Sequence, residues 1–266
     1  MVTPGDTTIV DEVSLAGRHA FVAGATGRIG SVVADTLAGL GADVVVHAGR
    51  SIEPARTLAK DLSERHGTRV TPVQADLTAG AQVEVLGESL HAAGITELDA
   101  LVNCVTGFTG RPAPLGRLDV DEFRRVVDVD LVGSFALVTT LLPWLRPRAG
   151  RIVLMSSLAG ERGRPAAAHL CAAKAGLSGL VRALSCELRP SGMRVNAVAP
   201  GPVVAEGETH PPGLPPGMAV SRPRDVARVV AFAVAGWSRG LDGQVLVVEG
   251  NVAQTDDGRA EAGRLT

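Results

Sequence analysis

Short apolar runs alternate with amphipathic stretches along most of this chain. Seven runs are rich in valine, alanine and leucine and are continuous enough to be strands buried on both faces. The segments between them carry apolar residues at helical spacing, which is typical of helices that cover a sheet. This alternation predicts one α/β domain with a doubly wound parallel sheet of about seven strands and helices on both faces. The predicted strands lie at residues 19–25, 42–49, 70–76, 98–105, 150–157, 193–200 and 243–250.

The pattern fades at both ends of the chain. Residues 1–16 are predicted to form a polar N-terminal arm, 17–253 the domain, and 254–266 a polar C-terminal tail. Within the domain, residues 205–222 are too rich in proline and glycine to be a core element. We expect them to form a long surface loop or lid.

Composition narrows the classes of protein that fit. The formal charge of −2 gives no field for polyanions, so nucleic acid is not an expected partner. No uninterrupted apolar run approaches the roughly 18 residues that span a bilayer, and the N-terminus does not resemble a secretory signal. The three cysteines lack metal-ligand spacing, which indicates no metal site and reduced thiols in a cytoplasmic protein.

A glycine-rich turn follows the first predicted strand and opens a helix. It contains Gly24, Gly27, Arg28, Ile29 and Gly30. Glycines allow a tight turn and close approach of a pyrophosphate, and the helix N-terminus offers it unpaired N–H groups. The alternative is a plain structural turn, but the order strand, turn, helix favours dinucleotide binding. Arg28 could itself contact a phosphate.

The second predicted strand ends near Arg50 and Ser51. An acidic residue here would bond the ribose hydroxyls of NAD, and none is present. A guanidinium and a hydroxyl suit a 2′-phosphate instead. We therefore predict NADP(H) as the cofactor, with an ordinary exposed arginine as the alternative.

Across residues 16–251 the motifs resemble those of the short-chain dehydrogenase/reductase family, which has a Rossmann-like fold and a nicotinamide cofactor. The resemblance implies that Asp76 and Leu77 lie beside the adenine and that Asn103 belongs to a degraded Asn-Asn-Ala-Gly motif. It also implies that the turn after the sixth strand shapes the nicotinamide pocket. That turn contains Pro200, Gly201 and Val203.

The same resemblance assigns chemical roles to residues of this chain and indicates that one expected residue is absent. Ser157 corresponds to the serine that polarises a substrate carbonyl, and Lys174 to the lysine that holds the nicotinamide ribose. The proton-donating tyrosine of the family belongs at Leu170, and the chain contains no tyrosine. Asp130 stands where the family has an asparagine, and Ala205 where it commonly has a threonine. Asp130 is predicted either to pair with Lys174 or to exchange protons.

Leucine can neither protonate nor hold the alkoxide that hydride transfer to a ketone would leave. Three substitutes are open: His169, although it points about 100° away from the position of Leu170 on a helix; His210 in the lid; and a hydroxyl of the substrate or a water near Ser157. With the last, Leu170 would widen the pocket for a bulky, polycyclic or enolised substrate.

Three function classes compete. The first, which we favour, is an atypical NADP(H)-dependent, ketoreductase-like oxidoreductase that acts on a small carbonyl substrate. The second is a non-redox cyclase, isomerase or dehydratase on the same fold, and the third is a catalytically silent binding subunit. The resemblance also implies a homodimer or homotetramer, paired through apolar faces of the helices near 120–145 and 169–189.

Overall fold

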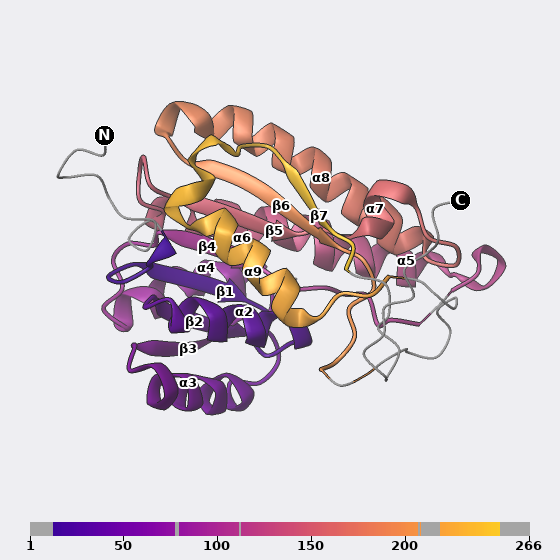
Figure 1. The fold of residues 1–266 in the computed structure, drawn as a ribbon. Helices are drawn as coiled ribbons and strands as arrows, with labels where there is room; N and C mark the ends of the chain where they lie inside the picture. The colour runs from indigo at the N-terminus through magenta and orange to yellow at the C-terminus, as the bar shows by residue number, and fades with distance from the viewer. Residues whose placement is uncertain (1–12, 78–79, 112, 207, 209–218, 251–266) are drawn as a thin grey trace, which may run out of the picture.

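Seven parallel strands form one sheet in the order β3-β2-β1-β4-β5-β6-β7 (Figure 1). The computed structural model describes residues 13–77, 80–111, 113–206, 208 and 219–250. Each strand lies within one of the seven apolar runs, so the predicted doubly wound sheet is confirmed. The strands are β1 (His19–Ala23), β2 (Asp43–Ala48), β3 (Val70–Gln74), β4 (Ala100–Asn103), β5 (Arg151–Met155), β6 (Arg194–Pro200) and β7 (Val245–Val248).

Helices connect the strands as the amphipathic segments predict. The long predicted helix over 120–145 is divided, because a π-helical turn, η2, separates α5 from α6. The α-helices are α2 (Arg28–Gly39), α3 (Glu53–His66), α4 (Gly80–Ala92), α5 (Val120–Val127), α6 (Gly133–Leu141), α7 (Leu158–Arg162), α8 (Ala168–Leu188) and α9 (Pro223–Val234). The shorter turns are η1 (Leu115–Arg117), η2 (Asp128–Val132), η3 (Leu142–Trp144), η4 (Arg189–Ser191) and η5 (Gly236–Gly240).

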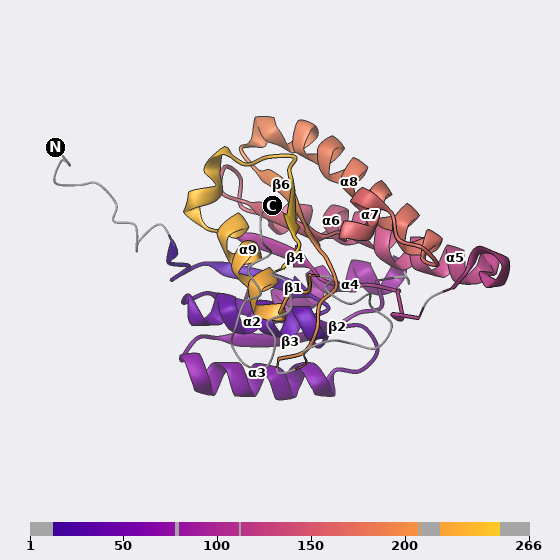
Figure 2. The same cartoon turned by 45° about the vertical axis from the view of Figure 1, so that its right-hand side comes forward.

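The core has two layers, one on each face of the sheet. Along β1, Ala20 and Val22 pack toward α2, α3 and α9, whereas Phe21 and Ala23 pack toward α4, α6 and α8. Figures 1 and 2 show α9 beside α2 on the first face, with α8 on the other side of the sheet. Successive side chains of a strand point to opposite faces, so a strand covered on both sides must be apolar throughout.

One helical run of the described residues, Val120–Trp144, is long and apolar enough by length and composition to cross a membrane. In this fold, however, the run packs on the sheet, where Leu137, Val138 and Leu141 are at most 1% exposed. The α6 part of the run therefore packs one of its faces into the core of the domain.

The ends of the predicted domain need adjustment. Leu15, placed in the polar arm, is 3% exposed, and its N–H donates to the carbonyl of Leu40. At the end of the predicted lid, Val220 and Ser221 are buried, and Ser221 forms a bridge with Val203. The packed domain thus starts before residue 17, and the predicted surface loop ends before residue 220. Residues 1–12, 207, 209–218 and 251–266, which include His210, lie outside the described part of the chain.

Strand order reverses between β1 and β4, which are neighbours in the sheet although two strands separate them in sequence. Open α/β sheets bind ligands at the carboxyl ends of the strands beside such a reversal. Gly24 follows β1 and Asn103 ends β4, so the predicted cofactor residues lie at this point.

Candidate active site

The glycine turn after β1 has a geometry that side chains would disrupt. Gly24 has φ of +69°, and a Cβ there would lie 3.0 Å from the N–H nitrogen of Val105. A Cβ on Gly30 would overlap the carbonyl oxygen of Gly24. Gly27 is the N-cap of α2 without a side-chain cap, and the first turn holds no acidic residue. The open N–H groups at this helix end can therefore receive an anion such as a pyrophosphate.

Arg28 connects this turn to the loop after β6. Its Nη1 donates to the carbonyl oxygen of Val203 at 3.0 Å. The second loop is itself held by the N–H of Gly201, which donates to Val248. Ile29 is partly buried against the core under the turn. The predicted pyrophosphate and nicotinamide segments are thus in direct contact.

The residues predicted to bind the adenosine part of the cofactor lie after β2 and β3. Arg50 and Ser51 are exposed, and among the described residues the Arg50 guanidinium has no hydrogen bond or ion pair. The Ser51 hydroxyl oxygen accepts a bond from Glu53 N–H at 3.4 Å. Asp76 is partly exposed, but Leu77 is 6% exposed and belongs to the core, so it can reach a cofactor only through its backbone.

At the end of β4, hydrogen bonds within the protein occupy the side chain of Asn103. Both amide atoms of Asn103 are engaged, since Nδ2 donates to Ser134 Oγ at 2.9 Å and Oδ1 accepts from Val105 N–H at 3.0 Å. The side chain therefore shapes the loop rather than facing a ligand. Beside it, burial raises the pKa of the Cys104 thiol to about 12, although nearby Lys174 opposes the shift. Cys104 is therefore a neutral packing residue at physiological pH.

Lys174 and Asp130 form a buried ion pair at the centre of the site. Their side chains are 4% and 0% exposed, and Lys174 Nζ lies 3.1 Å from Asp130 Oδ2. Nζ also donates to the carbonyl oxygen of Met155 at 2.7 Å. An ammonium has three N–H donors, so one remains for a ligand.

Asp130 accepts bonds from three sides. Besides Lys174, the Thr106 hydroxyl donates to Oδ2 at 2.8 Å, and the Gly107 N–H donates to Oδ1. The Lys174 ammonium and the Gly107 N–H can only donate, which suits an ionised carboxylate. Of the two roles left open by the sequence, the geometry favours the ion pair. The π-helical turn η2 places this carboxylate, and such turns often occur at functional sites.

The two serines after β5 have different roles. Ser156 is buried, and its Oγ donates to the carbonyl of Lys174 at 3.3 Å. Ser157 is the N-cap of α7, and its Oγ accepts a bond from Ala159 N–H at 3.2 Å. That bond uses a lone pair and leaves the Ser157 proton free to donate. Ser157, which is predicted to polarise the substrate carbonyl, is thus the serine whose hydroxyl hydrogen is free to donate.

Leu170 lies in a small apolar cluster, at 5% exposure. The cluster contains Ala159, Ala167, Phe108 and Cys171. His169 is 1% exposed and meets the Phe108 ring edge-on, with centroids 5.4 Å apart. Its Nδ1 has no hydrogen-bond partner among the described residues. An aliphatic and aromatic patch therefore surrounds the position at which the sequence resemblance predicts the family's phenol.

Three residues of this region were not selected from the sequence. Thr106 and Phe108 lie in the loop after β4. The only sequence signal for them was their position after the end of a predicted strand. His47 lies inside an apolar run that reads as a core strand, although a histidine within such a run is unusual. In each case the partners are distant in sequence, so local patterns could not reveal the contacts.

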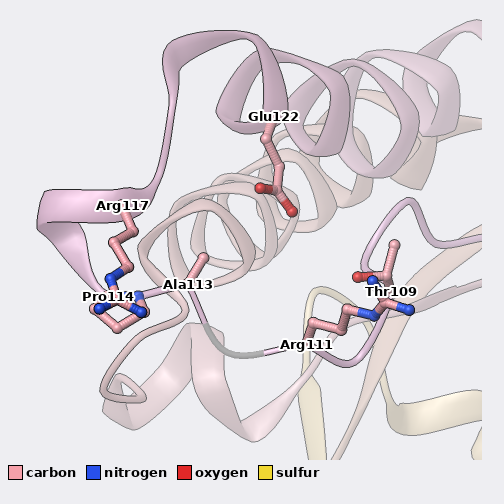
Figure 3. Close-up of a pocket in the computed structure, with 6 residues that line it drawn as sticks. All are labelled: Thr109, Arg111, Ala113, Pro114, Arg117 and Glu122. Atoms are coloured by element: carbon pink, nitrogen blue, oxygen red, sulfur yellow. The ribbon is translucent and has the colours of Figure 1, made fainter.

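A hollow of about 680 Å³ opens beyond Phe108, next to the start of α5. Figure 3 shows that Arg111 and Arg117 point to opposite sides of it, while Glu122 points inward. Ala113 lines it and donates its N–H to Ala166, just before α8. The two guanidinium groups therefore do not converge on one anion site.

Comparison with known proteins identifies clear relatives. The sequence model of a family described as short chain dehydrogenase matches residues 18–210. A 3-oxoacyl-[acyl-carrier-protein] reductase from Rickettsia bellii is 32% identical over 250 residues, which cover 90% of this chain and 98% of the relative. An uncharacterised oxidoreductase, YmfI, from Bacillus subtilis is 32% identical over 88% of this chain and 98% of its own length.

Solved structures share the same fold. A blue fluorescent protein from a metagenomic library, in complex with NADPH, matches with a TM-score of 0.79 at 29% identity, over 89% of this chain and 98% of that chain. A short chain dehydrogenase from Burkholderia cenocepacia, in complex with NADP, matches with a TM-score of 0.78 at 29% identity, over 89% and 98%.

Proposed function

Because this chain belongs to the short-chain dehydrogenase family, we propose that it is an NADP(H)-dependent, ketoreductase-like oxidoreductase whose proton does not come from the side chain at residue 170. The expected substrate is a small carbonyl compound that is polycyclic or enolisable. The family supports an oxidoreductase that uses a nicotinamide cofactor. Relatives in complex with NADPH and with NADP support the choice of cofactor.

The residues present fit a dinucleotide. The glycine turn leaves space that a Cβ would fill, and the uncapped start of α2 offers N–H donors for a pyrophosphate. Arg50 and Ser51 would hold a 2′-phosphate, and Lys174 would hold the nicotinamide ribose. When bound, the cofactor would supply or accept the hydride.

One observation carries the proposal: the buried Lys174 ammonium keeps a free N–H beside an aliphatic Leu170. Holding a buried charge in place costs free energy unless it is paired, and here Asp130 and Met155 serve that purpose. A binding role for Lys174 explains why the charge is kept where the phenol it usually serves is absent.

The Ser157 hydroxyl would donate to the substrate oxygen and stabilise the charge that develops there. Neither Leu170 nor its apolar neighbours can supply H⁺. We propose that a hydroxyl of the substrate, or water near Ser157, protonates that oxygen. His169 is the side-chain alternative, because its Nδ1 is free of partners among the described residues.

The test is a fluorescence titration with NADPH and NADH, followed by assays of cofactor oxidation with a panel of ketones and quinones. We expect NADPH to bind at least about tenfold more tightly than NADH, because of a charge-assisted contact to the 2′-phosphate. Binding with turnover supports the reductase. Binding without net redox change would favour the cyclase, isomerase or dehydratase class, and absence of binding would favour a silent subunit.

Arg50→Ala provides the matched control. We expect it to weaken NADPH by about tenfold and to leave NADH within about twofold, since only NADPH carries the 2′-phosphate. Equal losses for both cofactors would contradict the role assigned to Arg50.

A further inference from the structure

His47 is buried in β2 and uses both ring nitrogens to join two segments of the cofactor site. It is 1% exposed. Its Nδ1 accepts a bond from Gly24 N–H at 3.2 Å, and its Nε2 lies 2.8 Å from the carbonyl oxygen of Ala75. Gly24 opens the pyrophosphate turn, and Ala75 precedes Asp76 on the adenine side. One imidazole thus spans the two segments predicted to hold the dinucleotide.

These two bonds define the protonation state of the ring. An amide N–H can only donate and a carbonyl oxygen can only accept, so the ring must be neutral with its hydrogen on Nε2. A proton on Nδ1 would face the Gly24 N–H donor and break that bond. Burial lowers the pKa of His47 below its ordinary value, while the bond to Ala75 and the charge of Asp76 act in the opposite direction.

Uncharged groups of β1 and of the glycine turn lie near the ring. β1 contributes the Phe21 ring, whose centroid is 6.0 Å away, and the turn contributes the Gly24 amide. Among the described residues, Asp76 at the end of β3 is the charged group that acts on the imidazole. Backbone hydrogen bonds also hold this turn, because the Ala25 N–H donates to the carbonyl oxygen of His47 and the Gly27 N–H donates to that of Gly24. The N–H of Gly24 itself donates to the imidazole ring of His47.

We propose that His47 is a positioning residue for the dinucleotide, whose neutral ring holds Gly24 and Ala75 in the binding conformation, and that protonation of this ring weakens cofactor binding. This inference rests on the proposed function, because it assumes that the glycine turn binds NADPH. His47 itself does not touch the cofactor; it acts through the backbone of the two segments.

The experiment measures the dissociation constant of NADPH from pH 5 to pH 9. For the natural protein, we expect tight binding above pH 6.5 and progressively weaker binding below it. His47→Asn keeps an acceptor near the Nδ1 position but does not titrate, so its affinity should stay within about threefold at pH 8 and change less with pH. His47→Leu removes the acceptor, and we expect about tenfold weaker binding at pH 8.

Stability supplies a second readout that needs no cofactor. The pKa of His47 is lowered in the folded state, so the unfolded chain binds the proton more strongly. Its contribution to stability is therefore complete above pH 6.5 and is lost as the pH falls toward the folded-state value. Urea unfolding should show this loss in the natural protein and a smaller one in His47→Asn. His91→Asn, on the surface of α4, should behave as the natural protein does.

The outcomes separate the two proposals. If the natural protein does not bind NADPH, the proposed function fails, and this inference fails with it. If the natural protein binds NADPH but His47→Leu binds equally well, or His47→Asn keeps the full pH dependence of binding, the inference alone is overturned. Should His47→Leu not fold, the comparison between His47→Asn and the natural protein still decides.

Discussion

At the scale of single residues, the proposed function depends on Leu170, which is predicted to stand at the position of the family tyrosine. Leu170 is held by Phe108 and two alanines, and the ammonium four residues later keeps its place through Asp130 and Met155. Leu170 itself offers no proton, whereas the ion pair holds Lys174 where the proposed cofactor contact needs it. The lack of a proton donor at Leu170 leads to one prediction, and the ion pair of Lys174 with Asp130 leads to another.

Leu170→Tyr should gain reduction of simple ketones. A general acid contributes about 10²- to 10⁴-fold to a rate, so even partial use of the new phenol gives a measurable increase. The larger ring crowds the cluster, at a cost of about 1–3 kcal/mol, and Phe108→Ala in the same chain makes room. The measurement is the rate of NADPH oxidation with a ketone panel. Leu170→Phe, which adds the ring without the hydroxyl, should gain nothing, and equal gains in both variants would contradict the assigned role.

Asp130→Ala should destabilise the fold by about 3–5 kcal/mol, because it leaves the buried Lys174 charge without its partner. Asp130→Asn should cost less, since an amide oxygen still accepts from Lys174 and Thr106. Urea unfolding measures both free energies. Equal stability of Asp130→Ala and the natural protein would show that the pair adds nothing to the folded state.

At the scale of elements, the glycine turn and α2 form one unit. Their packing depends on missing side chains, because Gly30 in the first turn of α2 lies against the carbonyl of Gly24. Gly27 has a less strict requirement: its φ is −83°, and a Cβ there would lie 3.3 Å from the same oxygen. The close packing of this turn therefore depends on a glycine at position 30 more than on one at position 27.

Gly30→Ala should weaken NADPH binding by at least about tenfold, because overpacking of about 1–3 kcal/mol displaces the turn. Gly27→Ala should weaken it by less than about threefold, because a shift of a few tenths of an ångström accommodates the methyl group. Fluorescence titration compares the two, with circular dichroism to verify folding. The reverse order of effects would contradict the close approach of Gly24 and Gly30.

At the scale of the whole molecule, two large apolar side chains remain exposed on η2 and α6. Val132 is 53% exposed and Phe135 is 49% exposed. Exposed apolar patches often mark protein interfaces. We propose that a second copy of this chain covers this face, giving the homodimer or homotetramer predicted from the sequence. The cytoplasmic location also remains a prediction, and the three cysteines are free, as a reducing compartment allows.

Phe135→Glu should lower the mass in solution, because a buried carboxylate would destabilise the interface. Light scattering coupled to size-exclusion chromatography measures this change. Val85→Glu, on α4 at 48% exposure, is a matched control that should leave the assembly intact. An unchanged mass for Phe135→Glu would place the interface elsewhere.

The sequence by itself determined the sheet, its helices and the location of the glycine turn that is predicted to bind the cofactor. Periodicity, glycine spacing and strand ends are local signals, and a strand buried on both faces requires an apolar run. The family resemblance also assigned Leu170, Lys174, Ser157 and Asp130 to one predicted site. It could not choose between an ion pair and a proton-exchanging role for Asp130.

Tertiary structure decided which partners each group meets. The three donors around Asp130, the packing of Phe108 on Leu170, and the link from His47 to Gly24 and Ala75 join segments far apart in the chain. A local pattern records which face of an element is apolar, but not which distant group fills its hydrogen bonds. Burial then makes those bonds decisive, because a polar group removed from water must find its partner within the fold.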